Sequence, residues 1–101
     1  VDPDATRARR RARDRAPAAQ PTRAYRCVLR IASGALPGTV ERVSAVFAGR
    51  GISLDAVQTA SGPPPTLTLR FRATEQLTDY LTRRLSRIRD VVRVEATPMR
   101  G

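Results

Sequence analysis

The side chains that could do chemistry in this sequence are few and widely spaced. The chain has no histidine, so imidazole serves neither as a general base nor as a metal ligand. Phosphate-binding patterns of the GxxxxGK and GxGxxG types are absent. The acidic residues after position 23 lack metal-ligand spacing; they are Glu41, Asp55, Glu75, Asp79, Asp90 and Glu95. We therefore expect a protein that is not an enzyme and that holds no metal or cofactor.

The single cysteine, Cys27, belongs to an apolar set that alternates with polar residues along the chain. Its companions in that set are Tyr25, Leu29 and Ile31. A cysteine in such a pattern packs as a small hydrophobic residue more often than it reacts, so we expect Cys27 in the core. One cysteine forms no internal disulfide, and no apolar run approaches the roughly 18 residues that span a bilayer. These features predict a cytoplasmic protein that does not contact a membrane.

A glycine- and proline-containing stretch, residues 32–38, could bind an anion. It predicts a loop that leads into a helix, and a helix N-terminus presents unpaired N–H groups and partial positive charge. Gly38 would let a ligand carboxylate approach the backbone closely. In the alternative interpretation, Pro37 and Gly38 only fix the geometry of a strand-to-helix turn.

Arginine supplies the remaining chemistry, since all 19 basic residues are arginine and the formal net charge is +10. In the predicted strands, five arginines alternate with apolar residues and should share one open sheet face; they are Arg26, Arg30, Arg70, Arg72 and Arg93. We interpret this face as a docking surface for an acidic partner, and the alternative is a solvated sheet face. The outward positions carry no aromatic residue, so sequence-specific stacking of RNA bases is not expected.

Six elements must position these residues, because the hydrophobic period switches between two and 3.6 along the chain. Apolar stripes predict one helix through Val40, Val43, Val46 and Phe47, ending near Arg50, and another through Leu77, Leu81, Leu85 and Ile88, capped by Thr74. Strands are predicted over residues 25–31, 52–59, 66–72 and 91–96. The order β-α-β-β-α-β predicts an α+β, ferredoxin-like fold: a four-stranded antiparallel sheet, its first and third strands central, with both helices on one face.

Residues 1–23 differ from the rest of the chain. They contain no Leu, Ile, Phe, Tyr or Met, and they include seven arginines but only three aspartates. A segment with so little to bury cannot offset the entropy of ordering, so we predict a disordered Arg/Ala/Pro-rich extension. A polyanion-binding arm is the alternative. The predicted domain then covers residues 24–98, and residues 99–101 form a short tail.

The stretch LPGTVERVSAVFAGRGISLDAV, residues 36–57, resembles an ACT domain, specifically that of the short acetolactate synthase (acetohydroxyacid synthase) regulatory small subunit. The residues in step with that family are Pro37, Gly38, Arg42, Val43, Phe47, Arg50, Gly51 and the run 52–55. Gln76 and Leu77, followed by the run 85–94, mirror the family's passage from the second helix to the last strand. The resemblance covers roughly residues 25–97.

This resemblance implies regulation. ACT domains typically pair side by side and bind amino acids at the interface, near the first strand-to-helix turn. The resemblance therefore implies a homodimer, through sheet edges or helices, that can bind a small amino acid. The implied binding residues are Ala35, Leu36, Pro37, Gly38, Thr39 and Ser53. It also implies a catalytic, thiamine-diphosphate-dependent partner subunit. That subunit would bind the cofactor, and this chain would activate it.

Two departures from the family alter the expected ligand response. Ala35 and Ser53 stand where valine-responsive members carry asparagine, and Ala35 has no side-chain hydrogen bond to offer. Each lost charge-assisted contact costs about 1.5–3 kcal/mol. We therefore expect weak or absent valine binding, with the amides of Gly38 and Thr39 as the residual anion site.

Three functions remain open at this point. The first is a non-catalytic regulatory subunit of an acetolactate synthase-like enzyme in branched-chain amino acid biosynthesis. The second is a stand-alone ACT module that senses another amino acid or metabolite. The third is a basic nucleic-acid-binding protein that uses the arginine-rich extension and the sheet face, and its binding would weaken steeply with salt.

Overall fold

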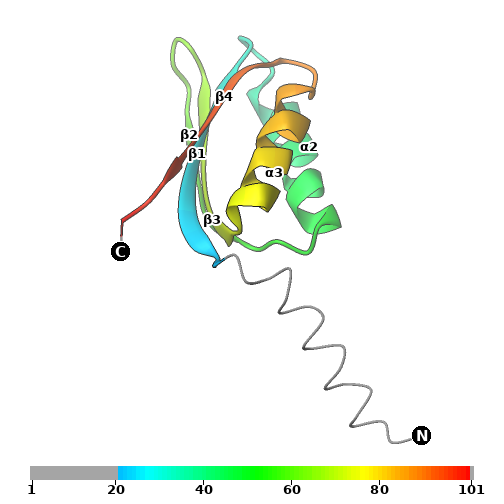
Figure 1. The fold of residues 1–101 in the computed structure, drawn as a ribbon. Coiled ribbons are helices and arrows are strands. Elements are labelled where there is room, and N and C mark those ends of the chain that lie inside the picture. Colours follow the sequence, from blue (N-terminus) through cyan, green and yellow to red (C-terminus); the bar gives the residue numbers. More distant parts are fainter. Residues whose placement is uncertain (1–20, 101) are drawn as a thin grey trace, which may run out of the picture.

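The computed structural model describes residues 21–100. Four strands and two helices follow one another in the predicted order; they are β1 (Arg23–Ile31), α2 (Leu36–Gly49), β2 (Leu54–Ala60), β3 (Thr66–Ala73), α3 (Glu75–Ser86) and β4 (Val91–Pro98). The strands form one antiparallel sheet in the order β2-β3-β1-β4. Both helices cover the same face of this sheet (Figure 1). The predicted ferredoxin-like fold is confirmed, with β1 and β3 at the centre.

The core lies between the two central strands and the helices. Alternate residues of β1 and β3 face the helices and are at most 5% exposed; they are Tyr25, Cys27, Leu29, Ile31, Leu67, Leu69, Phe71 and Ala73. Val43 and Phe47 from α2 and Leu81 and Leu85 from α3 close the core from the other side. The Phe47 ring meets the Phe71 ring edge-on, with 4.9 Å between centroids. The period-two pattern therefore assigned the correct residues to the core.

The first helix begins earlier than the sequence indicates. The predicted loop to residue 38 is wrong, because α2 begins at Leu36 and includes Pro37 and Gly38 in its first turn. Proline is tolerated at that position, since N–H groups in the first turn have no intrahelical partner. Gly34, with φ of 81°, makes the turn that precedes the helix. The N-cap of α3 is as predicted: the Leu77 N–H donates to Thr74 Oγ1 at 3.1 Å.

Several strand boundaries also differ from the prediction. Arg23, assigned to the extension, is the first residue of β1 and pairs with Ala73. β2 begins at Leu54 because the chain before it is still closing α2, with the Ile52 N–H donating to the Phe47 carbonyl at 3.0 Å. Pairing continues past Pro98, since the Met99 N–H donates to the Ala24 carbonyl at 2.8 Å. Residues 1–20 of the predicted disordered extension lie outside the described residues.

Neither helix in the described part of the chain is both long enough and apolar enough to cross a bilayer.

Candidate ligand turn and arginine face

The predicted ligand turn is a compact segment at the start of α2, but its last residue is turned inward. Thr39 is fully buried. Its hydroxyl donates to the Ala35 carbonyl at 2.8 Å, and its N–H donates to the same oxygen at 3.1 Å. That amide is therefore engaged within the helix, and the predicted residual anion site loses one of its two donors. Pro37 and Gly38 remain exposed.

Ser53 is exposed but lies far from that turn within one copy of the chain. It follows α2, whereas Ala35 precedes it. α2 has 14 residues, which at 1.5 Å per residue is about 21 Å. Figure 1 accordingly shows the two connections at opposite ends of the helix. One copy does not bring Ser53 to the other predicted ligand-binding residues, so a site that used all six would need two copies.

The five predicted partner-binding arginines do lie together. Arg26 on β1 is the register partner of Arg70 on β3, and Arg30 on β1 is the register partner of Arg93 on β4. Register partners project to the same side of a sheet, and here that is the side without helices. Arg72 joins them, two residues along from Arg70, and all five are exposed. We call these five residues the arginine face.

Two features of the arginine face are electrostatic. Like charges directly opposite each other across two strands are destabilising, and this face has two such pairs. A carboxylate also lies on it: Glu95 Oε1 is 2.6 Å from Arg93 Nη2, and both side chains are more than half exposed. Exposed ion pairs of this kind contribute about 0–1 kcal/mol. One carboxylate beside five arginines offsets only part of the positive charge on the face.

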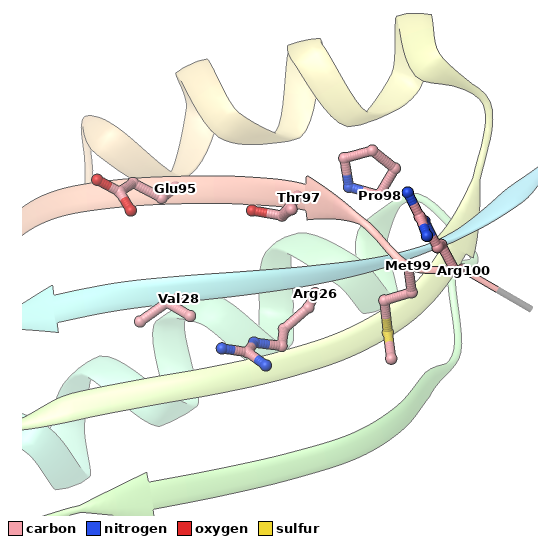
Figure 2. Close-up of a pocket in the computed structure, with 7 residues that line it drawn as sticks. All are labelled: Arg26, Val28, Glu95, Thr97, Pro98, Met99 and Arg100. Atoms are coloured by element: carbon pink, nitrogen blue, oxygen red, sulfur yellow. The ribbon is translucent and has the colours of Figure 1, made fainter.

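A hollow of about 370 Å³ opens beside the arginine face where β1 and β4 run together; it is lined by Arg26, Val28, Glu95, Thr97, Pro98, Met99 and Arg100 (Figure 2). Val28 and Met99 are half-buried and give the hollow apolar surface. Arg26 and Arg100 add hydrogen-bond donors to its lining, and Glu95 adds an acceptor. The sequence interpretation missed this hollow.

No protein-family model matches the chain, and no curated protein matches its sequence. Solved structures do match its fold. The C-terminal domain of the MgtC protein from Mycobacterium tuberculosis aligns with a TM-score of 0.63 and 18% identity over 76% of this chain and 87% of that one. A homoserine dehydrogenase from Thiobacillus denitrificans aligns with a TM-score of 0.67 and 18% identity over 81% of this chain and 18% of that one.

A third similar structure is an ACT domain. The ACT domain from the GTP pyrophosphokinase of Chlorobium tepidum aligns with a TM-score of 0.51 and 13% identity over 75% of this chain and 96% of that domain. The chain has an ACT-like ferredoxin fold. The identities are too low to show more than the fold. The narrower resemblance to the acetolactate synthase small subunit rests on the sequence motifs alone.

The ACT-like domain keeps its single cysteine inside. Cys27 is 1% exposed, as predicted for a core residue. Burial raises the pKa of its thiol to about 12, because a thiolate would lose its hydration there. The thiol is therefore protonated at neutral pH. Residues 21–100 also contain no cluster of three or more His, Cys, Asp or Glu residues that could hold a metal ion.

One further contact of the ACT-like domain was not foreseen from the sequence. The Arg50 guanidinium carbon lies 4.1 Å from the centroid of the Tyr80 ring. Such a cation–π contact is worth about 0.5–1 kcal/mol at an exposed site. Because Arg50 follows α2 and Tyr80 belongs to α3, the contact ties the two helices together. Arg50, which also belongs to the family-like motif, therefore has a structural role here.

Proposed function

We propose that this chain is a non-catalytic regulatory module that acts on a larger enzyme in the cytoplasm. The observation that carries the proposal is an ACT-like fold with its single cysteine buried in the core and five exposed arginines together on one sheet face. Such a surface is suited to contact with another molecule. The chemistry would then belong to the partner.

Two of the similar structures support an association with larger enzymes. One is described as the ACT domain from a GTP pyrophosphokinase, and this chain matches 18% of the homoserine dehydrogenase chain. Domains of this fold therefore occur as parts of enzymes. The motifs in residues 36–57 favour one enzyme class in particular. We infer an acetolactate synthase-like, thiamine-diphosphate-dependent partner in branched-chain amino acid biosynthesis.

The proposal includes a homodimer formed through a sheet edge. Among residues 21–100, the two large hydrophobic residues that stay exposed are Val57, at 45%, on β2, and Val92, at 66%, on β4. These are the two edge strands, and an exposed edge offers unpaired N–H and carbonyl groups to another chain. Pairing would also supply the second copy that the Ser53 position requires.

The expected effector response is weak for valine. Ala35 has no polar side chain, and both donors of Thr39 already bond to the Ala35 carbonyl. A ligand carboxylate at this turn would meet few free donors. A small amino acid could still bind between two copies, where Ser53 would offer a hydroxyl group.

The test is to capture the tagged full chain from its native cell and to assay the captured complex for acetolactate formation from pyruvate. We expect a thiamine-diphosphate-dependent synthase in the complex, slower turnover after this chain is removed, and recovery when it is added back. Added valine should change the rate little. A complex without any such synthase would contradict the proposal, and strong inhibition by valine would contradict the expected ligand response.

A further inference from the structure

We propose that the arginine face is the docking site for an acidic protein segment, one apolar side chain of which enters the hollow beside Met99. The inference rests on the proposed function only in that a regulatory module needs a partner. The chemistry of that partner follows from the face itself.

The charge arrangement indicates an anionic occupant. Arg26 and Arg70, and likewise Arg30 and Arg93, are directly opposite each other, so the free domain holds two repulsive pairs. A carboxylate placed over either pair would accept charge-assisted hydrogen bonds from guanidinium groups on two strands. Docking would therefore replace repulsion by attraction at both positions. Glu95, bonded to Arg93, leaves the face strongly positive.

The hollow indicates that the occupant also carries an apolar group. Three of its lining residues are apolar, Val28, Pro98 and Met99, and the other four are polar or charged. Protein interfaces typically bury a few apolar or aromatic side chains in pockets that a polar rim surrounds. A hollow lined in part by apolar side chains, next to the arginine face, matches that arrangement on a small scale. An acidic segment with one leucine-sized side chain would fit both the arginine face and the hollow.

Two observations favour a protein segment over a nucleic acid strand. Single-stranded nucleic acids bind to sheets through bases stacked on aromatic residues, and the rings of the central strands, Tyr25 and Phe71, are buried against the helices. Glu95 also lines the hollow, and its carboxylate would repel a phosphate or a carboxylate placed there. A protein segment can place a cation or an N–H group against that carboxylate, whereas a phosphate backbone has neither.

The test measures the binding of the full chain to three fluorescent probes by anisotropy. The probes are a short polyglutamate peptide with one central leucine, the same peptide with alanine in its place, and an oligo(dT) strand of equal charge. We expect the leucine peptide to bind about tenfold more tightly than the alanine peptide, the factor that corresponds to burial of most of a leucine side chain. We also expect the leucine peptide to bind more tightly than oligo(dT).

Two variants separate the parts of the site, and a third is a matched control. Arg26→Gln with Arg70→Gln should weaken both peptides strongly. Met99→Ala should remove the preference for leucine and leave the binding of the alanine peptide unchanged. Arg83→Gln with Arg84→Gln removes the same charge from the exposed end of α3, and it should leave peptide affinity nearly unchanged. Circular dichroism of each variant checks that the fold is kept.

Three results would overturn the inference. Equal binding of the two peptides would show that no leucine side chain enters the hollow. Tighter binding of oligo(dT) would indicate a nucleic acid face, and equal losses of peptide affinity in the two double variants would show attraction to net charge alone.

Failure of this inference is distinguishable from failure of the proposed function. A synthase that co-purifies with the chain while the peptide preference is absent would bind through another surface, and peptide selectivity without a captured synthase would leave the docking site intact.

Discussion

At the scale of single residues, position in the alternating pattern decides what each side chain can do. Cys27 and Arg26 are neighbours on β1, yet one is buried and the other exposed. The sequence predicted both outcomes, because period-two alternation in a central strand separates the two faces of a sheet. It did not predict the inward Thr39, whose side chain bonds back to the Ala35 carbonyl in the first turn of α2.

Cys27 should react slowly with thiol reagents in the folded chain. Only the thiolate attacks, and burial raises the pKa of this thiol from an ordinary 9.0 to about 12. We expect little labelling by iodoacetamide near neutral pH and full labelling in urea, measured by mass spectrometry. Rapid labelling of the native chain, at the rate of a free cysteine, would place the thiol at the surface.

The same thiol gives stability a pH dependence. Because its pKa is higher in the folded state, the folded chain keeps a proton that the unfolded chain loses. The free energy of unfolding should therefore fall as pH rises from about 9 to about 12. Urea denaturation across that range checks this, and a Cys27→Ala variant should show a smaller slope.

At the scale of elements, the sequence predicted central strands better than edges and helix starts. β3 is surrounded by turn signals and has strict alternation, and its prediction was correct to within one residue. β2 was placed two residues early, because Ile52 is apolar but bonds back to the end of α2. The hollow could not be predicted, because no local sequence pattern encodes the β1–β4 register or the hydrogen bond from the Met99 N–H to the Ala24 carbonyl. These two features place Val28 and Met99 in the lining of the same hollow.

The N-cap of α3 should contribute measurably to stability. Replacing Thr74 with alanine removes the acceptor for the Leu77 N–H and should cost about 1 kcal/mol of unfolding free energy. Urea denaturation measures this cost. Ser44→Ala, at an exposed position within α2, is the control and should change stability little. Equal effects of the two substitutions would show that the cap is not formed.

At the scale of the whole molecule, the proposal requires two copies joined at a sheet edge. A lysine on an edge strand disfavours pairing with another chain. We expect Val57→Lys on β2 or Val92→Lys on β4 to convert the dimer to a monomer, measured by size exclusion with light scattering. Ser44→Lys adds the same charge on α2 and should remain dimeric. A dimer that survives both edge substitutions would rule out pairing through the sheet.

The regulatory role is tested most directly by the turnover of the captured synthase with and without this chain. We expect that the isolated chain converts no pyruvate, that the stripped synthase is slow, and that adding the chain restores the synthase rate in a saturable manner. A synthase whose rate is indifferent to the chain, or acetolactate produced by the purified chain alone, would contradict that role.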